Sequence, residues 1–201
     1  MSREQRPIRR VCVYCGSSGG GFVARAREFG GLLAARGIEL VYGGGGVGLM
    51  GAVADEVLAG GGRVTGVIPQ FLEDKELGHK GVQTMHVVET MHERKLKMME
   101  LADAFVTLPG GFGTLEELFE VLAWSQLQLH AKPVGVLNWG GYYDGLLACL
   151  ERMVEERLLR GKDRERMMDA ADGAGLLAQL EAWEAPSEAK WEDPEFWDER
   201  I

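Results

Sequence analysis

The sequence predicts an α/β fold in which a doubly wound parallel sheet carries helices on both faces. Short apolar runs alternate with segments whose apolar residues recur at helical spacing, up to about residue 183. Glycine-rich turns follow three of these runs, which is typical of a strand that passes directly into a helix. Alternation at this spacing indicates parallel strands joined by right-handed crossovers.

The expected strands are short, apolar and bounded by glycine, proline or polar residues. They cover residues 10–15, 38–42, 63–68, 85–88, 104–108, 133–137 and 167–170. The expected helices have apolar residues on one face. They cover residues 22–36, 47–59, 91–101, 114–128, 142–159 and 174–183. A polar connection, 70–83, separates the third strand from the fourth.

The chain length of 201 residues suits one domain with a complete hydrophobic core. We expect residues 1–185 to form that domain, because the sequence shows neither an internal repeat nor a second domain. Residues 186–201 are acidic and rich in tryptophan, and we expect an extended tail with Trp191, Phe196 and Trp197 as its anchors.

Composition limits the classes of function. A net charge of -9 argues against non-specific nucleic-acid binding, although a local basic site can still bind a small phosphate ester. Apolar runs stay below the ~18 residues that a membrane span needs. The first residues are polar and basic, unlike a signal peptide. We therefore expect a cytoplasmic protein without a membrane or nucleic-acid partner.

Cysteine chemistry is not favoured. Cys12 and Cys15 have CxxC spacing, but they lie on an expected strand, where residues three apart face opposite sides. Cys149 stands in an apolar helix, where we expect it in the core. His, Cys and Asp residues do not show metal-ligand spacing, so we expect neither a metal nor a cofactor.

The segment LPGGFGTLEELFE (108–120) predicts a phosphate-binding turn between a strand and a helix. Backbone N–H groups and a helix N-terminus point at an anion in such a turn. The residues that we expect to bind phosphate there are Gly110, Gly111, Phe112, Gly113 and Thr114.

Two acidic residues follow immediately. Thr114 and Glu117 are three apart and share a helix face, whereas Glu116 is rotated by roughly 100° from Glu117. Glu117 would then lie one turn deeper on the ligand side. The alternative is that both carboxylates only complement the helix dipole.

A second glycine-rich turn, 43–48, matches G-x-G-x-x-G, but six glycines within nine residues would match many patterns. A dinucleotide site also needs an acidic residue after the next strand, where residues 68–70 read Ile-Pro-Gln. We therefore interpret Gly44 and Gly45 as additional donors to a phosphate. Ser17 and Ser18, after the first strand, either donate to a phosphate or cap a helix.

Arg94 and Lys95 lie near the start of an expected helix, although cations suit the other end of a helix dipole. This placement indicates a nearby anion. The alternative is a solvated basic face that includes Lys97.

Together these motifs resemble the Lonely Guy (LOG) family of cytokinin-activating phosphoribohydrolases. PGGFGTLEE (109–117) matches PGGxGTxxE, and MHERK (91–95) precedes it at the family's distance. CGSS, VYGGGGVGLMG, GVIP and KPVGVLN also fit, in order, so the resemblance covers roughly residues 8–183. Many members carry the label lysine decarboxylase, but no lysine here is placed for a pyridoxal Schiff base.

The resemblance implies a modified Rossmann fold, a homodimer, and hydrolysis of a nucleoside 5'-monophosphate to free base and ribose 5-phosphate. By position, Arg94 and Glu117 match the catalytic pair. Lys95, Glu76 and the 111–116 turn match substrate contacts. Two alternatives stay open: a general nucleotide nucleosidase that also takes AMP, and a non-catalytic carrier of a nucleotide or of molybdenum cofactor.

Overall fold

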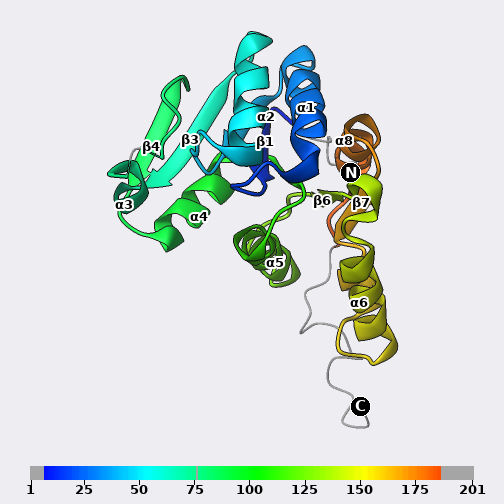
Figure 1. Cartoon of the computed structure of the whole chain (residues 1–201). Coiled ribbons are helices and arrows are strands. Elements are labelled where there is room, and N and C mark those ends of the chain that lie inside the picture. The colour runs from blue at the N-terminus through cyan, green and yellow to red at the C-terminus, as the bar shows by residue number, and fades with distance from the viewer. Residues whose placement is uncertain (1–6, 76, 187–201) are drawn as a thin grey trace.

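Seven parallel strands form a single sheet in the computed structural model, which describes residues 7–75 and 77–186 (Figure 1). In chain order the strands are β1 Arg10–Tyr14, β2 Glu39–Tyr42, β3 Val64–Pro69, β4 Thr84–Val88, β5 Ala104–Thr107, β6 Val134–Leu137 and β7 Met167–Ala170. Their order across the sheet is β4-β3-β2-β1-β5-β6-β7, with every neighbouring pair parallel. The predicted parallel sheet is confirmed.

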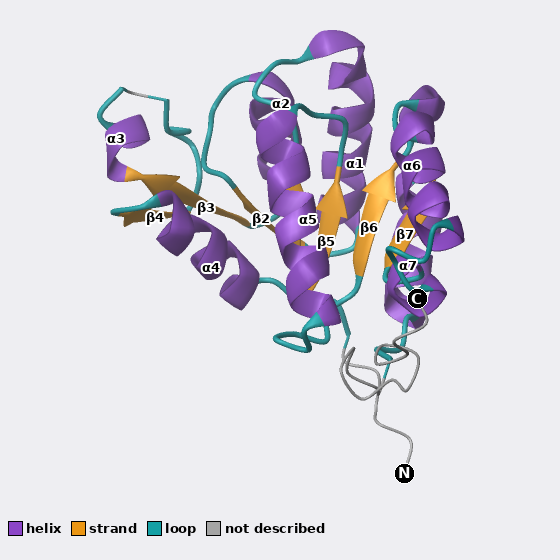
Figure 2. Cartoon of the chain, turned by 90° about the horizontal axis from the view of Figure 1, so that it is seen from below, coloured by secondary structure: helices purple, strands orange, loops and turns teal. Residues whose placement is uncertain are grey.

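Helices cover both faces of this sheet (Figures 1 and 2). One face is packed by α1 Val23–Ala35, α2 Gly48–Ala59 and α8 Gly173–Ala182. The other is packed by α4 Met91–Leu101, α5 Phe112–Gln126 and α6 Asp144–Glu155. The shorter helices are η1 Gly20–Phe22, α3 Gln70–Glu73, η2 Trp139–Gly141 and α7 Gly161–Arg164. The doubly wound arrangement is therefore also confirmed.

The central strands are buried on both faces. Along β1, Val11 and Val13 belong to the hydrophobic cluster under α1 and α2, whereas Cys12 and Tyr14 belong to the cluster under α4 and α5. Alternating side chains of a strand produce this division. Cys15 joins the first cluster, so Cys12 and Cys15 lie on opposite faces, as predicted.

The sheet reverses its winding between β1 and β5. The chain leaves β1 to form α1 on one face, and it leaves β5 to form α5 on the other. Ligands of such sheets bind where neighbouring connections diverge, outside the carboxyl ends of the strands. The Gly16 N–H donates to the Pro109 carbonyl at 3.1 Å and ties the two turns together at this point.

Some local predictions were wrong. The helix expected over 142–159 is shorter in the structure, where α6 covers Asp144–Glu155. Arg157, with φ 59°, lies in the left-handed region and ends that run. The predicted 70–83 connection is present and begins with the short helix α3. Cys149 is exposed rather than in the core. Leu150 is the buried residue of α6, and one step along a helix turns a side chain by roughly 100° away from it.

Four residues named in the sequence predictions lie outside the described residues: Glu76, Trp191, Phe196 and Trp197. Among the described helices, none is both long and apolar enough to cross a membrane.

Candidate active site

The glycine turns after β1, β2 and β5 meet at the carboxyl edge of the sheet, because these three strands are neighbours. Gly16 connects them: its N–H donates to Pro109, and its carbonyl accepts from the Leu49 N–H at 3.1 Å. Ser17 and Ser18 are exposed in the same turn. Residues far apart in sequence are thus brought to one edge, as the strand order predicts.

The turn after β5 presents free backbone donors. Gly111 precedes α5 without a side-chain cap. Within the described part of the chain, the N–H groups of Gly111, Phe112 and Gly113 donate to no protein acceptor. Gly110 must be glycine, because an added Cβ would lie 2.1 Å from the Thr114 Oγ1. Free N–H groups at the start of a 15-residue helix form a site that attracts an anion.

Arg94 and Glu117 form a buried ion pair beside this turn. The Arg94 Nη1 lies 3.2 Å from the Glu117 Oε1, with about a tenth of each side chain exposed. Arg94 also donates through Nε to the Val67 carbonyl at 3.1 Å and through Nη2 to the Gly43 carbonyl at 3.4 Å. A Cβ on Gly43 would lie 1.9 Å from the Nη2, so any side chain there would displace the guanidinium. One guanidinium thus joins β3, the turn after β2 and α5.

Burial governs the protonation of Glu117. Desolvation raises the pKa of its carboxyl from 4.5 to about 7, against the lowering effect of Arg94, while the neighbouring charge of Glu116 also raises it. Near neutral pH this carboxyl therefore exists in both the acid and the carboxylate form. Such a group is suited to general acid–base chemistry.

Lys95 faces the two other acids of α5. Its Nζ pairs with the Glu116 carboxylate and, at 2.9 Å, with the Glu120 carboxylate. Burial acts to lower the pKa of Lys95, but its hydrogen bonds to these carboxylates raise the pKa above its ordinary value. Glu117 thus lies in the buried pair, whereas Glu116 is half exposed and holds Lys95. This division of the two acids agrees with their predicted helix faces.

A loop closes over the turn after β2. The Gly46 N–H donates to the Leu77 carbonyl at 3.1 Å, and the His79 N–H donates to the Gly44 carbonyl at 2.9 Å. Gly45 forms an isolated antiparallel bridge with Gly78 in the same loop. Gly44 and Gly45 are consequently buried beneath this loop rather than open to solvent.

Two hydroxyls that the sequence did not indicate as part of the site also contact the turn after β5. The Tyr142 Oη donates to the Gly110 carbonyl at 2.8 Å, and the Tyr143 Oη donates to the Leu108 carbonyl at 2.6 Å. Both tyrosines follow η2 at the carboxyl edge of the sheet. The signal in the sequence that could have revealed these contacts is a pair of adjacent tyrosines next to two glycines after an expected strand.

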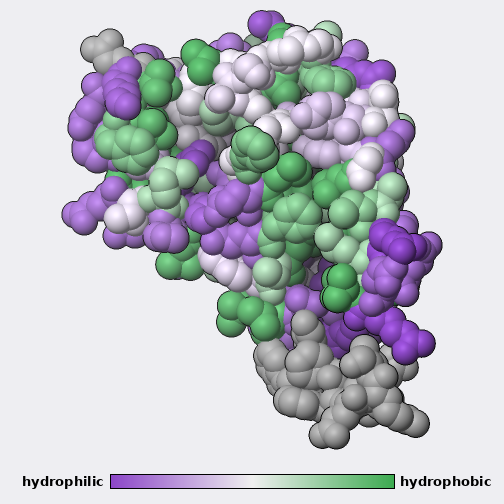
Figure 3. Space-filling model, turned by 60° about the horizontal axis from the view of Figure 1, so that its bottom comes forward, coloured by the Kyte–Doolittle hydropathy of each residue, from purple (hydrophilic) through white to green (hydrophobic). Residues whose placement is uncertain are grey.

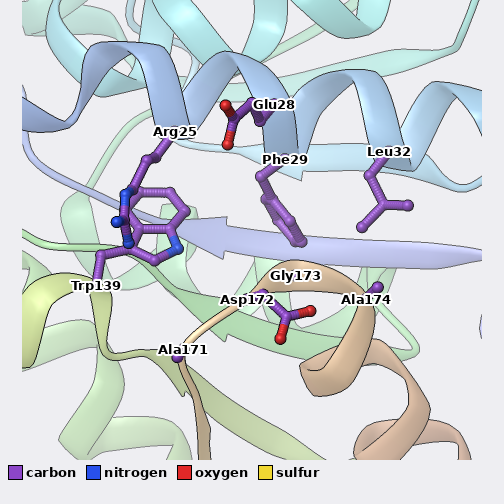
Figure 4. A pocket seen from close by; sticks show the side chains of 9 residues that line it. All are labelled: Arg25, Glu28, Phe29, Leu32, Trp139, Ala171, Asp172, Gly173 and Ala174. Carbon is purple, nitrogen blue, oxygen red and sulfur yellow. The ribbon is translucent and has the colours of Figure 1, made fainter.

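A separate cavity of about 460 Å³ lies between α1 and α8 (Figure 4). Arg25, Glu28, Trp139 and Asp172 are among its lining residues, and it contains none of the candidate site residues. Its size alone does not connect it with the Arg94–Glu117 pair.

Fold and site together define a Rossmann-like α/β protein with an anion-attracting turn beside a buried carboxyl–guanidinium pair. The chain is 50% identical to the probable cytokinin riboside 5'-monophosphate phosphoribohydrolase LOGL9 of Oryza sativa subsp. japonica, over 90% of this chain and 81% of the relative. It is 44% identical to the corresponding enzyme LOG3 of Arabidopsis thaliana, over 90% and 86%. The chain belongs to the cytokinin riboside 5'-monophosphate phosphoribohydrolase (LOG) family. The family model that matches residues 50–180 is described as possible lysine decarboxylase.

Solved structures show the same fold at lower identity. The molybdenum cofactor binding protein from Rippkaea orientalis superposes with a TM-score of 0.66 at 19% identity, covering 90% of this chain and 98% of that one. The molybdenum cofactor carrier protein from Chlamydomonas reinhardtii gives 0.63 at 21% identity, covering 87% and 98%. At such identities the likeness concerns the fold alone.

Proposed function

We propose that this protein hydrolyses the N-glycosidic bond of a nucleoside 5'-monophosphate and releases free base and ribose 5-phosphate. The proposed substrates are cytokinin ribotides, with an N6-modified adenine, and AMP. The buried Arg94–Glu117 pair beside the free N–H groups of 111–113 is the observation that carries this proposal. Family membership supports it, because the relatives are named for this activity.

The 5'-phosphate would bind at the start of α5. The N–H groups of the 110–114 turn and the Thr114 hydroxyl are its donors, and the helix dipole favours its charge. Lys95 adds positive charge nearby, which Glu116 and Glu120 balance in the free protein. Binding energy from the phosphate then positions the ribose for reaction.

Glu117 would act on the ribose ring. As the bond from C1' to the base nitrogen breaks, its electron pair leaves with the base and positive charge builds on the sugar. A carboxylate stabilises that charge and takes a proton from the water that attacks C1'. The departing base takes up a proton from water, and Glu117 returns the proton that it accepted to solvent. Arg94 would hold Glu117 in place by the direct ion pair and would also contact the substrate.

One assay tests this function. Purified protein is incubated with AMP, isopentenyladenosine 5'-monophosphate, GMP, CMP and the unphosphorylated isopentenyl riboside, and released base is measured by chromatography. We expect release from the adenine-type monophosphates only. Activity on the riboside would contradict the phosphate anchor. Release from none of them would instead favour a carrier of a nucleotide or of molybdenum cofactor on the same fold. The ratio of rates on the two adenine-type substrates separates a cytokinin enzyme from a general nucleosidase.

The pKa of Glu117 predicts the pH dependence. Its carboxylate is the active form, so kcat/KM for AMP should rise with pH along a limb centred near pH 7. Glu116→Gln should shift this limb to lower pH, because the Glu116 charge raises the pKa of Glu117. Profiles from pH 5 to 9 for both proteins check this. The substrate phosphate also titrates, with a pKa near 6, but the substitution does not change it. An unmoved limb would exclude Glu117 as its origin.

We further propose a homodimer formed through the face of α5 and α6. Phe119 of α5 is exposed there, as are Leu127 and Leu129 just after α5 and Leu158 just after α6, and Figure 3 shows hydrophobic surface gathered on this side. A groove between the two helices is lined by Phe119, Leu122, Leu150 and Met153 among others. Exposed apolar surface of this kind marks an interaction site.

Phe119→Asp should therefore convert the protein to a monomer, because it places a charge in that contact. Light scattering coupled to size exclusion gives the mass. Val87→Asp is the matched control, since Val87 is similarly exposed but lies on the edge strand β4. A wild-type monomer, or a dimer that survives Phe119→Asp, would exclude this interface.

A further inference from the structure

Hydrogen bonds from outside the turn hold three successive carbonyls between β5 and α5. The Leu108 carbonyl accepts from the Tyr143 Oη at 2.6 Å, and the Gly110 carbonyl accepts from the Tyr142 Oη at 2.8 Å. The Pro109 carbonyl accepts from the Gly16 N–H at 3.1 Å. The orientation of each of these peptide planes is therefore set by a neighbour.

Each of these contacts has a different consequence for the donors of the turn. In a planar trans peptide the C=O and the following N–H point in opposite directions, and the described chain has no cis peptide. The Tyr142 hydroxyl holds the Gly110 carbonyl. It therefore also directs the Gly111 N–H, which points to the side opposite Tyr142. The carbonyl that Tyr143 holds precedes Pro109, which has no N–H to direct.

Tyr142 is itself held from two sides. Its ring packs edge-on against Phe22 at 5.5 Å and against Tyr143 at 4.9 Å, between ring centroids. Gly140 and Gly141, with φ 62° and 75°, form the left-handed turn that leads into it. Tyr142 is 46% exposed to solvent, whereas Tyr143 is buried. Loss of the Tyr142 hydroxyl should thus cost little stability.

We propose that Tyr142 is a positioning residue that aims the Gly111 N–H at the 5'-phosphate of the substrate. This inference rests on the proposed function, because it assumes that the turn binds phosphate. The Phe112 and Gly113 N–H groups follow in α5 and keep their direction from the helix. Tyr142 thus controls the donor that lies just outside the helix and has no helical geometry to orient it.

Tyr142→Phe tests the proposal, with Tyr143→Phe as the matched control. For Tyr142→Phe we expect roughly 5- to 10-fold weaker binding of ribose 5-phosphate and AMP, because a donor to a charged group is misdirected. KM for AMP should rise by the same factor, with kcat within about 2-fold and an unchanged melting temperature. Affinity for adenosine should not change. For Tyr143→Phe we expect a lower melting temperature, since the buried Leu108 carbonyl loses its donor, and a smaller effect on phosphate binding.

Calorimetric titration with ribose 5-phosphate measures the binding without turnover. A protein that binds this ligand but releases no base refutes the proposed hydrolysis and still tests Tyr142. The inference is overturned if Tyr142→Phe binds ribose 5-phosphate as the wild type does, or if the wild type does not bind it. It is also overturned if AMP and adenosine lose affinity equally, or if any loss occurs only together with a fall in melting temperature.

Discussion

Replacing Glu117 with Gln should lower kcat for release of base from AMP by roughly 10³-fold or more, because the variant loses both charge stabilisation and a proton acceptor. Gln keeps the size of the side chain and can still accept a hydrogen bond from Arg94, so the fold should be retained. Base release under saturating AMP measures the loss of turnover. Circular dichroism and ribose 5-phosphate binding measure whether the fold is retained.

Glu116→Gln is the matched control for this substitution. Glu116 is the adjacent acid on the same helix, but it is half exposed and pairs with Lys95, which keeps Glu120 as a partner. We expect its kcat to stay within about 10-fold of the wild type. Near-normal turnover by Glu117→Gln, or equal losses in the two variants, would refute the role that we assign to Glu117.

Replacing Arg94 with Ala should have the second-largest effect, a loss of roughly 10²- to 10³-fold in kcat/KM. Arg94 lowers the pKa of Glu117, so its removal leaves less of the carboxylate at neutral pH. The limb of the pH profile should therefore move to higher pH. The buried pair also loses one partner, which should cost about 3 kcal/mol in the free energy of unfolding.

The double substitution Arg94→Ala, Glu117→Gln separates the loss of activity from the loss of stability. It removes the unpaired buried charge, so we expect it to recover stability relative to Arg94→Ala but not activity. Chemical denaturation and base release measure these quantities. A change in Arg94→Ala that is confined to thermal stability would assign Arg94 a purely structural role.

Much of the fold could be predicted from the sequence, because strand and helix patterns are local. The helix at Met91–Leu101 was predicted with the bounds that the structure shows. In the structure, Thr90 and Glu93 form a capping box at its start. The exposure of Cys149 was missed, because an apolar helix pattern does not tell which residues another element covers. Burial depends on packing partners that lie far away in the sequence.

The sequence by itself determined the glycine turn before α5 and the division of the two acids that follow it. Thr114 and Glu117 are both buried on one side of α5, as helix geometry requires of residues three apart. Glycine at Gly110 is also a local requirement, set by the nearby Thr114 side chain. These features arise within one strand–turn–helix unit, so their physics is contained in adjacent residues.

Only the tertiary structure decided which partners complete the site. It brought Arg94 from α4 to Glu117 on α5, a pairing that only the family resemblance had implied, and Tyr142 from beyond β6 to the Gly110 carbonyl. Burial beside Arg94 then set the pKa of Glu117 near 7, a value that no local pattern contains. The reason is physical: contact and desolvation depend on which strands are neighbours in the sheet, whereas sequence periodicity reports only the shape of each element.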